Sequence, residues 1–319
     1  MNKKIKLNIT KRAKTLSCIF VLCLVFFSTS HALANTKAST KKLSCKTLRS
    51  MARAYMAYGN YGKAQPLAET ALKLAKERNV PNKELSMCLG DLSYIYTNLG
   101  QLDDAEKMCK LGLKLQEKVY DKHDPYVAYS LRNLSSIYLQ QEKNDQAQIT
   151  LGRALAIMNK YHTPDDRVLA PFYIDKAKIL AAKNQVAQAE TLFSKALKII
   201  IDSYGADHLY SANVMSDVAE FYISNAKYDQ AEPLTQKALV VQEKMYGSRH
   251  HLVAPSWLAM AKICRAKGQY TQAEKFIAKA QAAVEKTGNI IAIAKLAEHA
   301  SETRAITTVA YVPTTNAVN

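Results

Sequence analysis

The sequence predicts an all-α protein in which antiparallel helix pairs stack into a solenoid. One motif recurs along most of the chain at a nearly constant step, as expected for a repeat architecture. Within each repeat, apolar residues follow the three-and-four spacing that places them on one face of a helix. Small residues recur at two fixed positions, where they allow neighbouring helices to approach closely.

The first element, residues 1–34, has the three parts of a cleavable secretory signal in the right order. A segment with six Lys and Arg comes first, residues 16–27 form an apolar core, and residues 32–34 (Ala-Leu-Ala) form a cleavage site. We therefore expect a periplasmic or secreted protein that is cut after Ala34. An uncleaved membrane anchor is the alternative, because residues 16–34 approach spanning length. The polar residues 28–31 argue against it.

The repeats are expected within residues 45–287, after a short lead-in at residues 35–44. Their anchor is an alanine followed by Glu or Gln, and successive anchors are 41, 42, 42, 42 and 42 residues apart. A tyrosine precedes four of the six anchors by nine residues, and a small residue follows every anchor by seven. Several columns in register predict about six repeats. The anchors are Ala64, Ala105, Ala147, Ala189, Ala231 and Ala273.

Each repeat is expected to form two helices joined by a short turn. The first helix carries apolar residues such as Leu89, Leu92 and Tyr96 at helical spacing. The second helix runs from the anchor alanine through the small residue that follows it. The turn between them is predicted where residues that tolerate a tight backbone are common. The turn positions are Gly59, Gly100, Glu142, Asn184, Ala226 and Gly268.

Two further elements are expected after the repeats. Repeat units cannot bury their own apolar faces, so an array needs capped ends. Residues 288–306 have a helical pattern with charged residues available for solvent, and we interpret them as a C-terminal capping helix. Residues 307–319 have no periodicity and are predicted to form a flexible tail.

The small-residue columns, the leucine after the second of them, and the aromatic residue late in the first helix resemble the tetratricopeptide repeat. The 42-residue step and connectors such as residues 204–208 (Tyr-Gly-Ala-Asp-His) are similar to the kinesin-light-chain subtype. The resemblance covers about three quarters of the chain. It implies a right-handed superhelical solenoid whose first helices line a concave groove. It also implies a binding scaffold, while leaving the partner open.

The resemblance further implies that equivalent residues of successive first helices form rows along the groove. One row contains Asp91, Asn133, Asp175 and Asp217, each 42 residues from the next. Such short polar side chains hold the ligand backbone in tetratricopeptide clamps; Asn133 matches the subtype, and the three Asp depart from it. Their oxygens can accept hydrogen bonds from peptide N–H groups. A merely solvated helix face is the alternative.

A second row lies three residues further along each first helix. Together with a neighbouring arginine, it supplies cations, one acid and one aromatic ring, which favours a selective surface over a uniformly charged trough. Solvation is again the alternative. The candidates are Arg53, Tyr94, Lys178, Glu220 and Lys262, with Arg132 beside them.

The chain is basic, and cleavage of the leader changes the charge without reversing it. Removing six of the 44 Lys and Arg leaves 38 against 27 Asp and Glu, a net charge of +11. This balance permits association with an anionic wall polymer or membrane surface. Nucleic acid is not expected as a partner, because of the predicted export and because the basic residues are scattered.

No pattern in the sequence indicates an enzyme or a cofactor. Residues 59–64 have some features of a phosphate loop, but the glycines are too close and Ala64 replaces the required Ser or Thr. No histidine pair has metal-ligand spacing on one helix, and we expect His208, His250 and His251 to act as local caps. The cysteines outside the leader are expected to pack as small apolar residues, with disulfides left open. They are Cys45, Cys88, Cys109 and Cys264.

These observations predict a non-catalytic protein-protein interaction scaffold that needs no cofactor or metal. We expect it to bind a peptide or a helix of a partner protein in the concave groove. The alternative is a structural protein that associates with an anionic cell-wall polymer or membrane surface through its positive charge.

Overall fold

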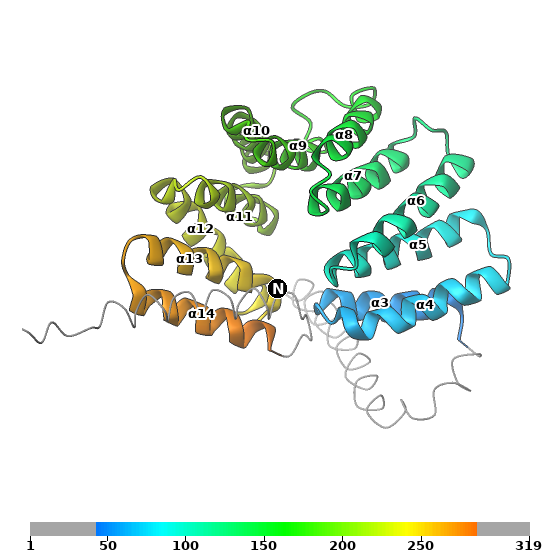
Figure 1. The fold of residues 1–319 in the computed structure, drawn as a ribbon, viewed down its shortest axis with the longest axis horizontal. Helices are drawn as coiled ribbons and strands as arrows, with labels where there is room; N and C mark the ends of the chain where they lie inside the picture. Colours follow the sequence, from blue (N-terminus) through cyan, green and yellow to red (C-terminus); the bar gives the residue numbers. More distant parts are fainter. Residues whose placement is uncertain (1–42, 286–319) are drawn as a thin grey trace, which may run out of the picture. The chain divides into compact units, whose positions relative to one another are not determined.

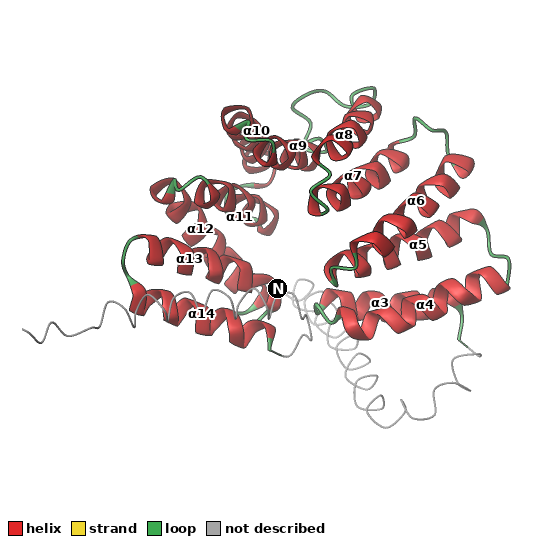
Figure 2. Ribbon diagram, in the orientation of Figure 1, coloured by secondary structure: helices red, strands yellow, loops and turns green. Residues whose placement is uncertain are grey.

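The computed structural model describes residues 43–285, and all regular secondary structure in that range is helical (Figure 2). The predicted all-α repeat fold is confirmed. The predicted leader, capping helix and tail, and most of the lead-in, lie outside the described residues. None of the described helices is both long enough and apolar enough to span a membrane.

The helices follow one another as six pairs along the chain (Figure 1). The first helices of the pairs are α3 (Cys45–Ala57), α5 (Asn82–Asn98), α7 (Pro125–Gln140), α9 (Ala170–Ala182), α11 (Leu209–Ser224) and α13 (Ala254–Ala266). The second helices are α4 (Tyr61–Glu77), α6 (Leu102–Val119), α8 (Asn144–Met158), α10 (Val186–Tyr204), α12 (Tyr228–Tyr246) and α14 (Tyr270–Val284). A short 3-10 helix, η3 (His251–Val253), precedes α13.

The chain divides into two compact units, residues 1–47 and residues 48–319. In the first unit the structure describes residues 43–47, where the Ser44 hydroxyl accepts a hydrogen bond from the Thr47 amide at 3.0 Å. This contact satisfies an N–H group at the start of α3. The second unit contains the rest of α3 and all later helices, and the site described below lies within it.

The anchor alanines explain how each pair packs. All six have no exposed surface, and so do the alanines that follow them by seven residues, while Gly112 takes that place in the second repeat. Helices pack at about 8 to 10 Å depending on the side chains between them, so methyl-sized residues allow the close approach. The repeat columns are therefore packing positions.

In each of the six pairs, one short turn links the two helices. At the predicted position of every turn stands a residue whose φ angle lies in the left-handed region. Glycine occupies three of these positions, with φ of 69°, 73° and 75° at Gly59, Gly100 and Gly268. The others are Glu142, Asn184 and Ala226, with φ of 61°, 60° and 57°. Glycine adopts this conformation without strain, whereas a residue with a Cβ atom does not. Turn geometry is thus kept even where the glycine is absent.

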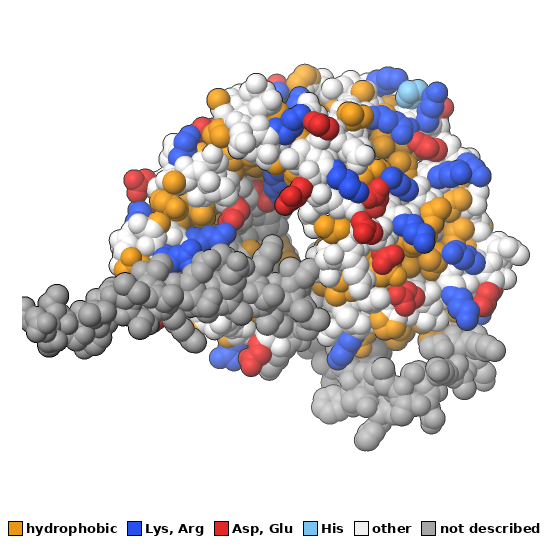
Figure 3. Space-filling view, viewed as in Figure 1, with side chains coloured by type: hydrophobic (Ala, Val, Ile, Leu, Met, Phe, Trp, Pro, Cys, Tyr) orange, Lys and Arg blue, Asp and Glu red, His pale blue; other side chains and the backbone are white. Residues whose placement is uncertain are grey.

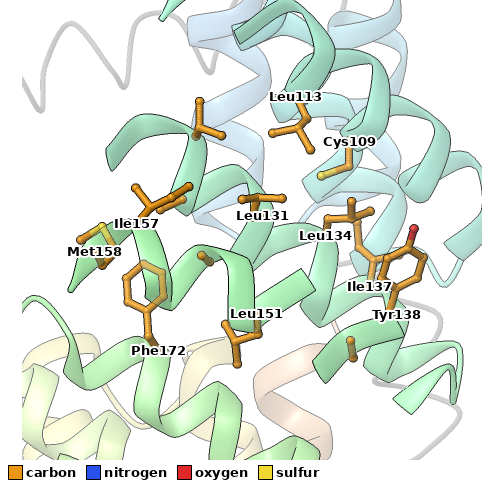
Figure 4. Close-up of a cluster of buried hydrophobic side chains, with 14 of the residues drawn as sticks. Cys109, Leu113, Leu131, Leu134, Ile137, Tyr138, Leu151, Ile157, Met158 and Phe172 are labelled. Carbon is orange, nitrogen blue, oxygen red and sulfur yellow. The ribbon is translucent and has the colours of Figure 1, made fainter. Parts of the chain in front are cut away.

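The core continues from one pair to the next. In the cluster that Figure 4 shows, Leu131 of α7 and Leu151 of α8 lie with Phe172, which comes from the first helix of the following repeat. Phe193 of α10 and Phe221 of α11 make the same kind of junction, with ring centroids 4.9 Å apart. Each repeat therefore buries its apolar face against its neighbours, as expected for an array.

The four cysteines of the repeats are buried as thiols. Burial raises the pKa of the Cys109 thiol to about 11, although a hydrogen bond with Ser93 opposes the shift. Cys109 is therefore protonated and uncharged at neutral pH. These residues pack as small apolar side chains, in the way that the sequence predicted.

Candidate functional site

The first helices of the third to sixth repeats contact one another in series. Helix α9 contacts both α7 and α11, and α11 contacts α13, whereas no two second helices of the described residues approach each other to the same extent. The array therefore curves toward its first helices, which lie on the inner side (Figure 1). We call this surface the inner face. It brings equivalent residues of successive repeats next to one another.

Ion pairs connect the first helices across the inner face, and we call this series the inner ladder. Its members join repeats one and two, three and four, four and five, and five and six. The pairs are Arg49–Asp91 (2.7 Å), Arg53–Asp91 (2.9 Å), Arg132–Asp175 (2.6 Å), Lys178–Asp217 (2.7 Å) and Lys262–Glu220 (2.7 Å). Because stacked helices are close together, a long Arg or Lys side chain can reach an acid on the next repeat.

Asp91 differs from the expected exposed row. Its side chain is only 7% exposed, because Arg49 and Arg53 cover it and donate hydrogen bonds to its two oxygens. Arg49 is also buried, and one of its terminal nitrogens has no partner among the described residues. The carboxylate of Asp91 therefore connects α5 to α3 through two charge-assisted hydrogen bonds, and removal of its charge would leave the buried Arg49 without an anionic partner.

Asp175 is the second carboxylate of the row that the structure buries. Arg132 donates to it from Nε at 2.6 Å and also lies over the ring of Phe172, 5.7 Å from its centroid. Burial raises the pKa of the Asp175 carboxyl, and the charges of Arg132 and Lys178 oppose that shift. Asp217 is 39% exposed and pairs with Lys178 close to solvent. Among the three acids of the row, burial therefore falls toward the later repeats.

The predicted site residues fall into two groups. Eight of the ten pair with one another or with Arg49, so the row of acids is neither a free acceptor surface nor a merely solvated one. A ligand must compete with a cation of the chain for each of these carboxylates. Tyr94 and Asn133 form the second group: both are exposed, and neither takes part in an ion pair. Their role in ligand binding stays a prediction.

Sequence reasoning missed a second set of contacts between repeats, which we call the turn ladder. In it, a lysine near the turn of one repeat reaches the Glu or Gln that follows the anchor alanine of the preceding repeat. The contacts are Lys143–Glu106 (3.0 Å), Lys183–Gln148 (2.6 Å), Lys227–Glu190 (2.7 Å) and Lys267–Glu232 (2.6 Å). The Ala-Glu or Ala-Gln motif was visible in the sequence, but its partner lies one repeat away.

Glu106 is the most strongly held acid of the turn ladder. Burial alone would raise its pKa, but hydrogen bonds with Lys110, Lys143 and Gln141 outweigh burial and lower the pKa to about 2. Lys110 and Lys143 also lie over the ring of Tyr138, at 5.5 and 5.9 Å from its centroid. The tyrosine column of the repeat thus supports the lysines that join successive repeats.

His208 and His250 serve as helix caps, as predicted, whereas His251, for which a cap was also predicted, lies inside η3. The ring nitrogen Nδ1 of His208 accepts a hydrogen bond from the amide of Tyr210 at 3.1 Å, and that of His250 accepts one from Leu252 at 3.3 Å. Residues 43–285 contain no cluster of His, Cys, Asp or Glu suited to a metal ion. Figure 3 shows basic and acidic side chains intermingled on the face that it draws, without separate positive and negative regions.

Comparison with known proteins agrees with this architecture. The profile of the tetratricopeptide repeat family matches residues 84–160 and 210–286, which contain the second, third, fifth and sixth pairs. No curated protein sequence matches the chain.

Among solved structures, BtubC (BKLC) from P. vanneervenii is 17% identical, with a TM-score of 0.51 over 82% of this chain and 95% of that one. A Rap protein complexed with Competence and Sporulation Factor is 13% identical, with a TM-score of 0.58 over 87% and 80%. Aspartyl phosphate phosphatase F from Bacillus subtilis is 16% identical, with a TM-score of 0.51 over 76% and 63%. At these identities the similarity concerns the fold.

Proposed function

Because this chain is a tetratricopeptide-repeat protein whose 42-residue step is of the kinesin-light-chain-like type, we propose that it is an exported, non-catalytic adaptor. In this proposal, it binds an extended polypeptide segment of a partner along the inner face. Tetratricopeptide arrays are scaffolds for protein-protein interaction and are typically non-catalytic. The Rap protein among the similar structures was solved with a bound factor.

The stacking of the first helices is the observation on which this proposal depends. Adjacent helices lie about 8 to 10 Å apart, and an extended peptide advances about 3.3 Å per residue. One repeat would therefore serve roughly every third residue of a bound segment. Positions on the inner face change from aromatic to polar to charged between repeats, as at Tyr94, Ser136 and Lys178, so successive repeats present different chemistry to the segment.

Export rests on the leader alone. Its basic segment, apolar core and small-residue cleavage site are arranged as in a secretory signal. The proposal therefore expects a mature chain that begins at Asn35, which N-terminal sequencing of the protein from the cell envelope or medium would detect.

Inner-face variants test the binding function directly. The purified protein is presented to an array of extended peptides, and the affinity of the best binder is measured by calorimetry. We expect the double variant Tyr94→Ala with Asn133→Ala, which removes no ion pair, to weaken binding at least about tenfold. The matched control is Val240→Ala on α12, a second helix, where the side chain is 67% exposed. Equal affinities in the wild type and the double variant would place the binding surface elsewhere.

The salt dependence of binding distinguishes the adaptor function from the alternative, which is association with an anionic surface. An adaptor with a mixed inner face is expected to retain peptide binding at about 0.5 M salt, where the Debye length is only about 4 Å. Association with anionic lipid vesicles that disappears at this salt concentration and ignores the inner-face variants would favour the anionic-surface role instead.

A further inference from the structure

The inner ladder has a gap between the second and third repeats. In the described residues no ion pair joins α5 to α7, although every other step between neighbouring first helices has one. The reason is visible in the sequence: Gly90 stands where Arg49 and Arg132 supply the cation for their steps, and Asn133 stands where Asp91 and Asp175 supply the acid. Both partners of the ion pair are therefore replaced at the same step.

A cavity of about 310 Å³ lies at this gap, lined by α5, α6 and α7. Buried apolar side chains line part of it, namely Cys109, Leu113 and Ile137. Gly90 lies at its exposed side, and a Cβ atom added there would meet nothing within 4 Å. The missing side chain of Gly90 thus leaves the cavity open toward the inner face.

The polar groups around the cavity are uncharged, and several have no partner. None of the lining residues is acidic or basic. Ser130 donates its hydroxyl to Oε1 of Gln116 at 2.5 Å, so the amide nitrogen of Gln116 is available. Among the described residues, the side chains of Asn133 and Ser136 have no hydrogen-bond partner either. The cavity therefore combines an apolar surface with neutral donors and acceptors.

The same two helices carry exposed apolar side chains. Of the described first helices, only α5 and α7 expose large hydrophobic residues: Met87 and Tyr94 on α5, and Tyr126 and Tyr129 on α7. Tyr94 lines the cavity and is 53% exposed. Tyr126 and Tyr129 pack against the rings of Tyr120 and Phe172 instead. An exposed aromatic side chain such as Tyr94 at a cavity is typical of a binding site.

We propose that this cavity is a pocket for a neutral side chain with an apolar body and a hydrogen-bonding end, such as tyrosine, of the bound segment. The inference rests on the proposed function, because the side chain belongs to the polypeptide on the inner face. A charged side chain would lose its hydration without gaining an opposite charge. A purely aliphatic one would leave the amides of Asn133 and Gln116 without partners. A tyrosine side chain satisfies both requirements.

The probe for a direct test is N-acetyl-tyrosinamide, titrated into the ¹⁵N-labelled protein and followed by amide chemical shifts. We expect saturable shifts at Gly90 and Asn133, and none from N-acetyl-lysinamide. Gly90→Leu, which fills the open side of the cavity, is expected to weaken binding of the probe at least tenfold. The matched control is Gly152→Leu in α8, another helical glycine with open space that lines a second cavity, and it should bind as the wild type does.

A second variant closes the pocket by restoring the ladder. Gly90→Arg with Asn133→Asp recreates the residue pair found at Arg49–Asp91 and Arg132–Asp175. We expect its melting temperature to equal or exceed that of the wild type. We also expect that it no longer binds N-acetyl-tyrosinamide. Saturable tyrosinamide shifts of equal affinity in Gly90→Leu and in the wild type, or equal binding of the lysine probe, would overturn the proposal.

The peptide array distinguishes this inference from the proposed function. If extended peptides bind without any preference for tyrosine and bind Gly90→Leu unchanged, the pocket is wrong and the adaptor function stands. If the tyrosine probe binds in the cavity and no extended peptide binds the protein, the cavity accepts a tyrosine side chain, but the adaptor function and the assignment of that side chain to a bound segment are wrong.

Discussion

At the scale of single residues, the acids of the inner face act first as connections between repeats. Asp91 and Asp175 are largely buried, and each accepts a hydrogen bond from an arginine of the preceding repeat. Sequence reasoning placed these residues on one surface but could not give them partners, because an ion pair across 42 or 43 positions depends on how far a side chain reaches. Sequence reasoning placed Arg132 beside the rows, but it did not predict the ion pairs.

Asp91→Asn tests the structural role of the inner ladder. The substitution leaves Arg49 and Arg53 beside an uncharged group, so we expect a loss of about 3 kcal/mol in the free energy of unfolding, as is typical when one partner of a buried pair is removed. Asp217→Asn is the control, and because that pair is near solvent it should lose less than about 1 kcal/mol. Urea unfolding followed by circular dichroism measures both, and equal losses would contradict the assignment.

The lowered pKa of Glu106 predicts that the stability of the fold decreases in acid. Its pKa is lowered from 4.5 to about 2, so the unfolded chain takes up the proton first as the pH falls. The stability that this carboxylate contributes is complete above about pH 4.5 and is lost as the pH approaches 2. We expect Glu106→Gln to be less stable than the wild type by about 1 kcal/mol at pH 6, since solvent screens part of the interaction, and the difference should vanish near pH 2.

The control for this measurement is Glu77→Gln. Glu77 is 3.9 Å from Lys73, and both side chains are mostly exposed. Its replacement should change stability by less than about 0.5 kcal/mol at either pH. A difference between wild type and Glu106→Gln that stays constant from pH 6 to pH 2 would show that the carboxylate is not held in the charged form.

At the scale of helices and turns, the sequence carries most of the information. The anchor alanines, the tyrosine column and the turn positions were each predicted, because local packing and backbone conformation repeat with the same period. The turn ladder was not, although one of its partners is the residue that defines the motif. A residue that recurs in each repeat is easily detected in the sequence. Its contact is harder to detect, because the lysine that binds the Glu or Gln after each anchor alanine lies in the next repeat.

Ala226→Gly tests the turn conformation. Ala226 has a φ of 57°, which places its Cβ atom in a strained position, and glycine would relieve that strain. We expect the variant to be more stable than the wild type by about 1 kcal/mol, against the usual effect of glycine. The control is Ala278→Gly, on the exposed side of α14, where glycine should destabilise by about 1 kcal/mol. Destabilisation by both substitutions would show that the turn does not adopt this conformation.

At the scale of the whole array, residues 48–285 curve enough to bring the first repeat against the connector before the sixth. A Cβ atom added at Gly59 would lie 2.6 Å from Cδ2 of His251, which belongs to η3. The two residues are far apart in the sequence, and no column of the repeat predicts the contact. Such an approach depends on the angle accumulated over all repeats, which small changes at each junction decide.

Gly59→Ala tests this contact, with Gly268→Ala as a matched control. Both glycines have a φ near 70° and occupy the same place in their turns, but a Cβ atom at Gly268 would meet nothing within 4 Å. In the control variant, Gly268→Ala, the free energy of unfolding should fall by about 1 kcal/mol because of backbone strain alone. Gly59→Ala should lose at least about 1 kcal/mol more, because His251 must move. Equal losses in thermal or urea unfolding would show that the two segments are not in contact.

The central claim is that the inner face holds the polypeptide partner. This claim is tested by photo-cross-linking to an extended peptide that binds the protein. A photoreactive amino acid replaces either Tyr94 on the inner face or Val240 on a second helix. After irradiation, mass spectrometry locates the cross-links. We predict a cross-link from position 94 that an excess of unlabelled peptide suppresses, and none from position 240. Cross-linking from position 240 but not from position 94 would contradict the account.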